Sequence, residues 1–209
     1  MTPFRHLWLA PLLMLAACAT TSAPARFYTL AQPTATASVA ATSPLFVEIL
    51  PVRVPERLAR PQIVVRAPGT DPARVRILEQ DRWSSHFNDE LRDALAGAIT
   101  ARLGAVDVSR GVLSTGTHSY RVTVELAQFD AVPDKQLQTV FSWSVQRTDT
   151  GAAAVCRTAN SQSVEGGVAG VVQGMRQAVA AVSEQGAVFA HRLSGLAVAR
   201  RNLAGQPTR

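Results

Sequence analysis

Apolar side chains recur at helical spacing between Phe87 and Leu103 and predict an amphipathic helix there. The positions that share one face of this helix are Phe87, Leu91, Ala94, Leu95, Ala98, Ile99 and Leu103. The hydroxyl of Ser84 or Ser85 can cap its first free backbone N–H groups, and Gly104 can end it in a left-handed conformation. No other element is specified so completely by the pattern.

A second and longer helical pattern runs from Val168 to Leu196. Its buried side is expected to carry Val168, Val171, Val172, Met175, Val179, Val182 and Phe189. Many of the other residues are Ala and Gly, which allow a helix to pack closely on a sheet.

Shorter apolar segments predict β-strands, because their apolar residues alternate with polar ones or form short continuous runs. These segments are Leu45–Val52, Gln62–Arg66, Val75–Leu78, Tyr120–Phe129, Leu137–Gln146 and Ala153–Val164. Three strands, a helix, three strands and a helix make an α/β fold. The sequence therefore predicts one domain in which a layered mixed β-sheet is packed by two main helices.

The N-terminus has the parts of an export signal. Arg5 supplies a positive charge, and Leu7–Ala17 is a continuous apolar run. A membrane-spanning helix needs about 20 apolar residues, so this run is too short to serve as one. Residues 1–17 are predicted to be a signal peptide.

Leu15-Ala16-Ala17-Cys18 resembles the bacterial lipobox, in which Leu and two small residues precede a cysteine. The resemblance implies lipid on the Cys18 sulfur, cleavage before Cys18 and acylation of the new amine. The alternative is an ordinary secretory signal with a chance cysteine. Ala19, rather than Asp, follows the cysteine, which favours sorting to the outer membrane with the protein facing the periplasm.

Composition divides the rest of the chain into three parts. Residues 18–25 are expected to form a lipidated tether, residues 26–199 one domain, and residues 200–209 a polar tail. Once Cys18 carries lipid, Cys156 is the only remaining cysteine, so an internal disulfide is excluded. A buried free thiol is the favoured interpretation of Cys156.

The chain has a formal net charge of +6, which comes almost entirely from arginine. A basic excess is common among nucleic-acid-binding proteins, but export argues against that class. Anionic lipid headgroups or an acidic partner fit better. The densest basic stretch contains Arg53, Arg57, Arg60 and Arg66. These side chains either line solvated strand edges or contact headgroups or a partner.

Candidate catalytic and metal-binding residues are few. His86, His118 and His191 show no metal-ligand spacing, and Cys156 has no cysteine near it in sequence. Ser85-His86 suggests a nucleophile beside a base, but adjacent residues at a helix start do not normally face each other. We therefore assign no catalytic, cofactor-binding or metal-binding residue from the sequence.

Three further segments, together with Cys18, carry a resemblance to a known family. They are Phe27–Leu30 (FYTL), Val52–Arg66 (VRVPERLARPQIVVR) and Arg82–Leu95 (RWSSHFNDELRDAL). With these segments the chain resembles the ABC-type transport auxiliary lipoproteins, also called PqiC-like proteins. The similarity covers essentially the whole mature domain in length and order, and the C-terminal third in pattern only.

This resemblance implies an outer-membrane lipoprotein that serves a system moving lipids between the two membranes. Its implied partners are an MCE-domain protein anchored in the inner membrane and the ABC-type or integral-membrane components at the base of that protein. It implies an α/β fold, no catalysis by this subunit, no cofactor, and compatibility with self-assembly into a ring. Only Cys18 is carried over from the family as a functional residue.

Two further classes of function stay open at the level of sequence. One is a periplasmic hydrolase that acts on envelope material through Ser85-His86, with an acidic or amide group supplied by folding. The other is a purely structural lipoprotein of the envelope. The binding module implied by the family resemblance is the preferred hypothesis.

Overall fold

The computed structural model describes residues 23–32, 45–67, 69, 71, 73–111 and 117–204, with the backbone alone at 191 and 193–204. Cys18, the signal segment 1–17 and part of the predicted tether lie outside the described residues. The fold class is confirmed, because two helices and mixed β-sheets form one α/β domain.

The strands divide between two sheets instead of forming one. The smaller sheet has the order β1 (Arg26–Tyr28), β4 (Val75–Trp83), β3 (Gln62–Arg66). The larger sheet has the order β5 (Ala105–Asp107), β2 (Leu45–Ile49), β6 (Tyr120–Val132), β7 (Gln136–Arg147), β8 (Ala153–Ser163). Both sheets are mixed, since β1 is parallel to β4 and β2 is parallel to β5 and β6, while the other pairs are antiparallel.

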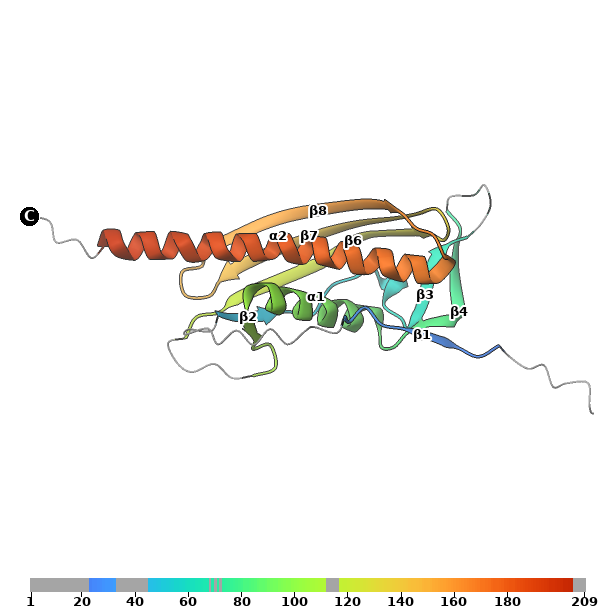
Figure 1. Ribbon diagram of the computed structural model, residues 1–209, viewed down its shortest axis with the longest axis horizontal. Helices are drawn as coiled ribbons and strands as arrows, with labels where there is room; N and C mark the ends of the chain where they lie inside the picture. The colour runs from blue at the N-terminus through green and yellow to red at the C-terminus, as the bar shows by residue number, and fades with distance from the viewer. Residues whose placement is uncertain are drawn as a thin grey trace, which may run out of the picture.

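The helices are α1 (Phe87–Leu103) and α2 (Gly167–Ala204), and a short 3-10 turn, η2 (Glu56–Leu58), precedes β3. α2 packs along β7 and β8, and α1 lies beside α2. Figure 1 shows β1, β3 and β4 gathered at one end of the long axis, while α2 extends past the larger sheet at the other end. The chain therefore enters the domain and leaves it at opposite ends.

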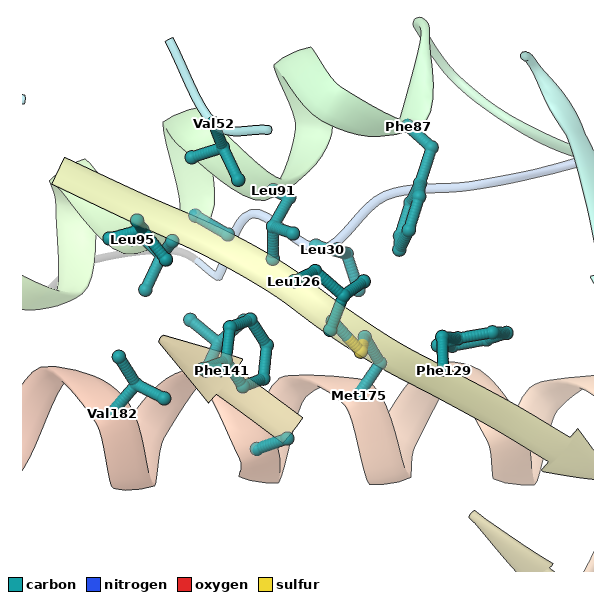
Figure 2. Close-up of a cluster of buried hydrophobic side chains, with 14 of the residues drawn as sticks. Leu30, Val52, Phe87, Leu91, Leu95, Leu126, Phe129, Phe141, Met175 and Val182 are labelled. Atoms are coloured by element: carbon teal, nitrogen blue, oxygen red, sulfur yellow. The ribbon is translucent and has the colours of Figure 1, made fainter. Parts of the chain in front are cut away.

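The core fills the space between the two helices and the larger sheet. In Figure 2, Leu91 and Leu95 point from α1, and Met175 and Val182 from α2, toward Leu126 of β6. All five side chains are buried. The predicted helical faces are thus confirmed at their central positions, whereas the outer ones, such as Ala98, Leu103, Val168 and Phe189, are only half-buried.

Several predicted boundaries were wrong. β4 continues to Trp83 although the prediction ended at Leu78, because the polar residue Asp81 is buried in the strand and bonded by its neighbours. β6 continues to Val132, and β1 and β5, of three residues each, were not predicted. α2 continues to Ala204, so it reaches into the segment predicted as a polar tail.

The N-terminal cap of α1 also differs from the prediction, while the bounds of the helix and its C-terminal end agree with it. The N-cap residue is His86, and no side chain caps the helix. The hydroxyls of Ser84 and Ser85 instead donate to the carboxylate of Glu90, an acceptor within the first turn. Gly104 ends the helix with φ of 58° and donates its N–H to the Thr100 carbonyl, as predicted.

Candidate functional site at the tether end of the domain

The predicted tether enters the folded domain through β1, so we call the sheet β1-β4-β3, together with η2, the tether end. Residues 18–25 lead directly to Arg26, the first residue of β1. Cys18 itself is outside the described residues, and its lipidation stays a prediction.

β1 is held on β4 by a buried carboxylate. The Arg26 guanidinium lies 2.8 Å from Asp81, and the Tyr28 hydroxyl donates to the same carboxylate at 3.1 Å. The two strands are parallel, with Arg26 beside Asp81 and Tyr28 beside Trp83. A strand of only three residues gains little from its backbone hydrogen bonds, so these side-chain contacts fix its position.

The residues after β1 are fixed by Glu90 of α1. Its Oε2 accepts hydrogen bonds from the Thr29 hydroxyl and the Leu30 backbone N–H, both at 2.9 Å. Its Oε1 accepts from the hydroxyls of Ser84 and Ser85, the latter at 3.1 Å. We call these five residues the Glu90 cluster.

The Glu90 cluster keeps a buried carboxylate charged. Burial by itself raises the pKa of Glu90, but the hydrogen bonds from Ser84, Leu30, Thr29 and Ser85 outweigh burial and lower it below its ordinary value. The cluster therefore joins the chain after β1 to α1 with an ionised acceptor at neutral pH.

A groove lies between α1 and α2 beside this junction. Its volume is about 430 Å³, and small side chains such as Ala98, Ala101 and Ala180 line it. Arg176 reaches across from α2 and donates from Nη2 to the Thr29 carbonyl at 2.7 Å. The groove thus borders the segment that the Glu90 cluster holds, and Leu30 is buried at its edge.

The four predicted contact arginines do not form one patch. Arg66 makes two bonds to Asp130 of β6, Nε to Oδ1 at 2.8 Å and Nη2 to Oδ2 at 2.5 Å. Arg53 is exposed, and its backbone continues the sheet beside β6, with its N–H donated to the Val124 carbonyl. Arg60 is half-buried, and its Nε meets no hydrogen-bond partner in the described part of the chain.

Arg57 and Arg66 do line a common hollow at the tether end. It has a volume of about 300 Å³ and lies where β3 and β4 meet the end of β6. Its remaining lining includes the buried side chains of Leu58, Val64 and Phe129 and the exposed Val75. We call this feature the basic hollow; the structure brings together only these two of the four arginines.

Exposed apolar side chains at the tether end were not predicted. Phe27 is 66% exposed, Val75 54% and Ile77 39%. Register places Val75 and Ile77 on the same side of the sheet as Arg66 and Val64, their partners on β3. The sequence predicted a strand at Val75–Leu78, which lies within β4, but it assigned no exposed face to that strand.

Ser85 and His86 do not form a catalytic pair. The Ser85 hydroxyl donates to Glu90 at 3.1 Å and contacts the backbone carbonyl of His86 rather than its ring. The His86 imidazole makes no hydrogen bond or ion pair with a described residue. The hydroxyl is therefore engaged with a carboxylate acceptor and not with the imidazole of His86.

Other chemistry is sparse in the described part of the chain. Cys156 is a free, half-buried thiol, not a fully buried one. Among the residues described, no three His, Cys, Asp or Glu side chains gather as a metal site. No helix within the described ranges combines the length and apolarity that a membrane crossing needs.

Comparison with known families decides the identity. The model of the family described as the ABC-type transport auxiliary lipoprotein component matches residues 28–187. The chain belongs to this family. A search of curated proteins finds no match to this auxiliary lipoprotein.

Solved structures support the same fold. The crystal structure of an uncharacterised protein aligns over 80% of the auxiliary lipoprotein and 99% of its own chain, with a TM-score of 0.62 and 20% identity. A Xanthomonas campestris protein of the family DUF330 aligns over 77% and 91%, with a TM-score of 0.54 and 14% identity. At these identities the likeness concerns the fold alone.

Two of the segments that resemble the family meet at the Glu90 cluster. Thr29 and Leu30 belong to FYTL, while Ser84, Ser85 and Glu90 belong to RWSSHFNDELRDAL. In this auxiliary lipoprotein these segments therefore have a structural role, which sequence reasoning missed. Thr29 and Leu30 lie 61 and 60 positions from their acceptor Glu90, so no local pattern connects them to it.

Proposed function

We propose that this chain is an outer-membrane-anchored periplasmic lipoprotein of an intermembrane lipid transport system, where it docks an inner-membrane-anchored MCE-domain protein. The observation that carries the proposal is the family match over residues 28–187. The lipobox-like segment ending at Cys18 supports the anchor, and Ala19 supports the outer membrane as its location.

The shape of the domain suits an adaptor. A tether confines a domain near one membrane and raises its effective concentration there. The tether enters at the end that holds β1, and the C-terminal end of α2 points to the opposite end (Figure 1). With 38 residues, α2 is about 57 Å long, so a membrane anchor at one end leaves the other end available deeper in the periplasm.

The proposal assigns no catalytic step to this subunit. Ser85 is the nucleophile of the alternative hydrolase hypothesis. Its hydroxyl donates a hydrogen bond to the Glu90 carboxylate, which has a structural role. We propose that headgroups or a partner contact the arginines Arg53, Arg57, Arg60 and Arg66. Arg57 is the best placed of the four, because it is exposed at the rim of the basic hollow.

The test is a crosslinking capture from cells that express the full chain with an affinity tag. We expect an MCE-domain protein to be recovered with the wild type and lost with Cys18→Ala, because the unanchored variant is not confined to the outer membrane. Labelled palmitate should enter the wild type but not Cys18→Ala, and the wild type should fractionate with the outer membrane. Recovery of no MCE or ABC-transport protein would contradict the docking role.

A further inference from the structure

We propose that the tether end is a membrane-contacting surface, in which Val75, Ile77 and the rim of the basic hollow lie against the anionic headgroups of the membrane that holds the Cys18 lipid. The proposal rests on the anchor assigned under the proposed function, and adds to it an orientation and a set of contact residues.

The apolar part of this surface is Val75 and Ile77 on β4. The two residues are separated by one position, so their side chains project from the same side of the strand. Isolated exposed apolar residues are common on proteins, so exposure alone would carry no argument. These two adjoin a hollow with an apolar floor, formed by Leu58, Val64 and Phe129, and therefore extend one continuous apolar surface.

The cationic part consists of Arg57, which lines the hollow, and of Arg74 and Arg76, which flank Val75 along the chain and by strand alternation project from the other side of β4. All three are exposed, and their guanidinium groups make no hydrogen bond or ion pair with any described residue. From Val52 to Trp83 the chain carries seven arginines and four acidic residues, so this stretch accounts for half of the net charge of +6. Apolar side chains among unpaired cations are typical of surfaces that bind the interface of an anionic membrane.

The length of the tether and its point of entry keep this surface close to the membrane. β1 pairs with the last residues of β4, with Arg26 beside Asp81, so the chain before Arg26 leaves the domain at the same sheet that carries Val75 and Ile77. Six residues of strand separate Asp81 from Val75, or about 20 Å. The eight-residue tether 18–25 spans at most about 28 Å. A lipid on Cys18 therefore keeps the bilayer within reach of Val75 and Ile77.

The experiment uses the full chain, matured and lipidated in cells and reconstituted into vesicles. All variants carry Cys156→Ser, and the thiol of Cys18 is blocked by its lipid. A single introduced cysteine is therefore the one free thiol that reacts with an environment-sensitive fluorophore. The test position is Ile77→Cys. The control is Val155→Cys, a position on β8 in the larger sheet that is 79% exposed. Vesicles contain phosphatidylcholine with or without phosphatidylglycerol, and a spin-labelled lipid quenches fluorophores at the interface.

We expect quenching severalfold stronger at position 77 than at position 155, with a blue shift of emission at 77 alone. Replacing Arg57, Arg74 and Arg76 by Gln, or omitting phosphatidylglycerol, should reduce the quenching at 77. Equal quenching at both positions, or none at 77, overturns the orientation. Quenching at 77 that is indifferent to phosphatidylglycerol and to the arginines overturns the anionic-headgroup contact. Circular dichroism of each variant verifies the fold.

Crosslinking capture of an MCE-domain protein is measured in cells that express the same variants of the full chain. Capture without quenching at 77 rejects this inference and leaves the proposed function standing. Quenching without capture rejects the docking role and leaves the membrane contact standing. Mass spectrometry that finds Cys18 without lipid rejects both.

Discussion

Glu90 is the single residue on which the junction between tether and domain most depends. Its two carboxylate oxygens accept four hydrogen bonds, two from the segment after β1 and two from the serines before α1. Among these donors the backbone N–H of Leu30 is buried, and a buried donor left without an acceptor costs about 1–3 kcal/mol, so the Glu90 carboxylate also stabilises the position of Leu30. The residue continues the connection between the two segments past the end of the β1–β4 ladder, where the Ser84 N–H donates to the Tyr28 carbonyl.

We expect Glu90→Gln to lower the free energy of unfolding by about 1–3 kcal/mol, because the amide nitrogen cannot accept the bonds that one carboxylate oxygen accepts. Asp89→Asn is the matched control, since Asp89 lies one position away in the same first turn and is exposed. Urea unfolding of the unlipidated chain from residue 19 onward measures both. Equal losses for the two variants would contradict a structural role for Glu90.

The pH dependence of the same variants tests the charge. The pKa of Glu90 is lower in the folded state than its ordinary value, so the carboxylate stabilises the fold above about pH 4.3, the pKa of an unfolded Glu. That contribution is lost as the pH falls through the folded pKa. The difference in unfolding free energy between wild type and Glu90→Gln should be constant near neutral pH and shrink in acid. Asp107 and Asp149 also have lowered pKa values, but they are present in both proteins, so their pH dependence cancels in this difference.

At the scale of elements, α2 depends on a glycine for its approach to the larger sheet. A Cβ added at Gly174 would lie 2.7 Å from Nε2 of Gln162, 3.0 Å from Leu137 and 3.1 Å from Val164. Gln162 also donates to the Gly174 carbonyl at 2.5 Å. The lack of a side chain at this position therefore allows the helix to pack directly on β7 and β8.

We expect Gly174→Ala to destabilise the domain by about 1–3 kcal/mol, because overpacking outweighs the better helix propensity of Ala. Gly186→Ala is the control in the same helix, where an added Cβ meets nothing within 4 Å. The free energy of unfolding of Gly186→Ala should rise by up to about 1 kcal/mol, because Ala has the higher helix propensity. Thermal unfolding distinguishes the two, and stabilisation by Gly174→Ala would refute close packing at this site.

At the scale of the whole molecule, our proposals give the two ends of the domain different tasks. The tether end faces the anchoring membrane in our proposal, and the C-terminal part of α2 extends beyond the larger sheet at the far end (Figure 1). The family match ends at residue 187, before this extension. An adaptor of this shape separates membrane contact from partner contact.

We expect a chain that stops after Arg192 to fold with nearly unchanged thermal stability and to lose crosslinking capture of the MCE-domain protein. The backbone of α2 extends past the larger sheet at this end, and the buried residues described on α2 all precede Arg192 (Figure 1). Removal of residues 205–209 alone is the control and should preserve capture. Capture that survives removal of the extension would place the partner contact elsewhere on the domain.

Local physics determined much of this protein from sequence. The spacing of Phe87, Leu91 and Leu95 specified α1, and the positive φ that Gly104 tolerates specified its end, because neighbours along the chain suffice for both. Local pattern also predicted the bounds of β3, and the order of the predicted strands and helices predicted the α/β class. The lipobox-like segment at Cys18 is equally local, although its modification is still to be tested.

Only the tertiary structure decided how the tether end is built. The predicted strand ended at Leu78, yet β4 continues through the buried Asp81 because Arg26 and Tyr28, more than 50 positions away, bind its carboxylate. Glu90 looked like an ordinary helix-start acid, and Arg57 and Arg66 were grouped with two arginines that lie elsewhere. The free energy of a polar side chain depends on partners that folding brings near, and their distance along the sequence hides them from any local pattern.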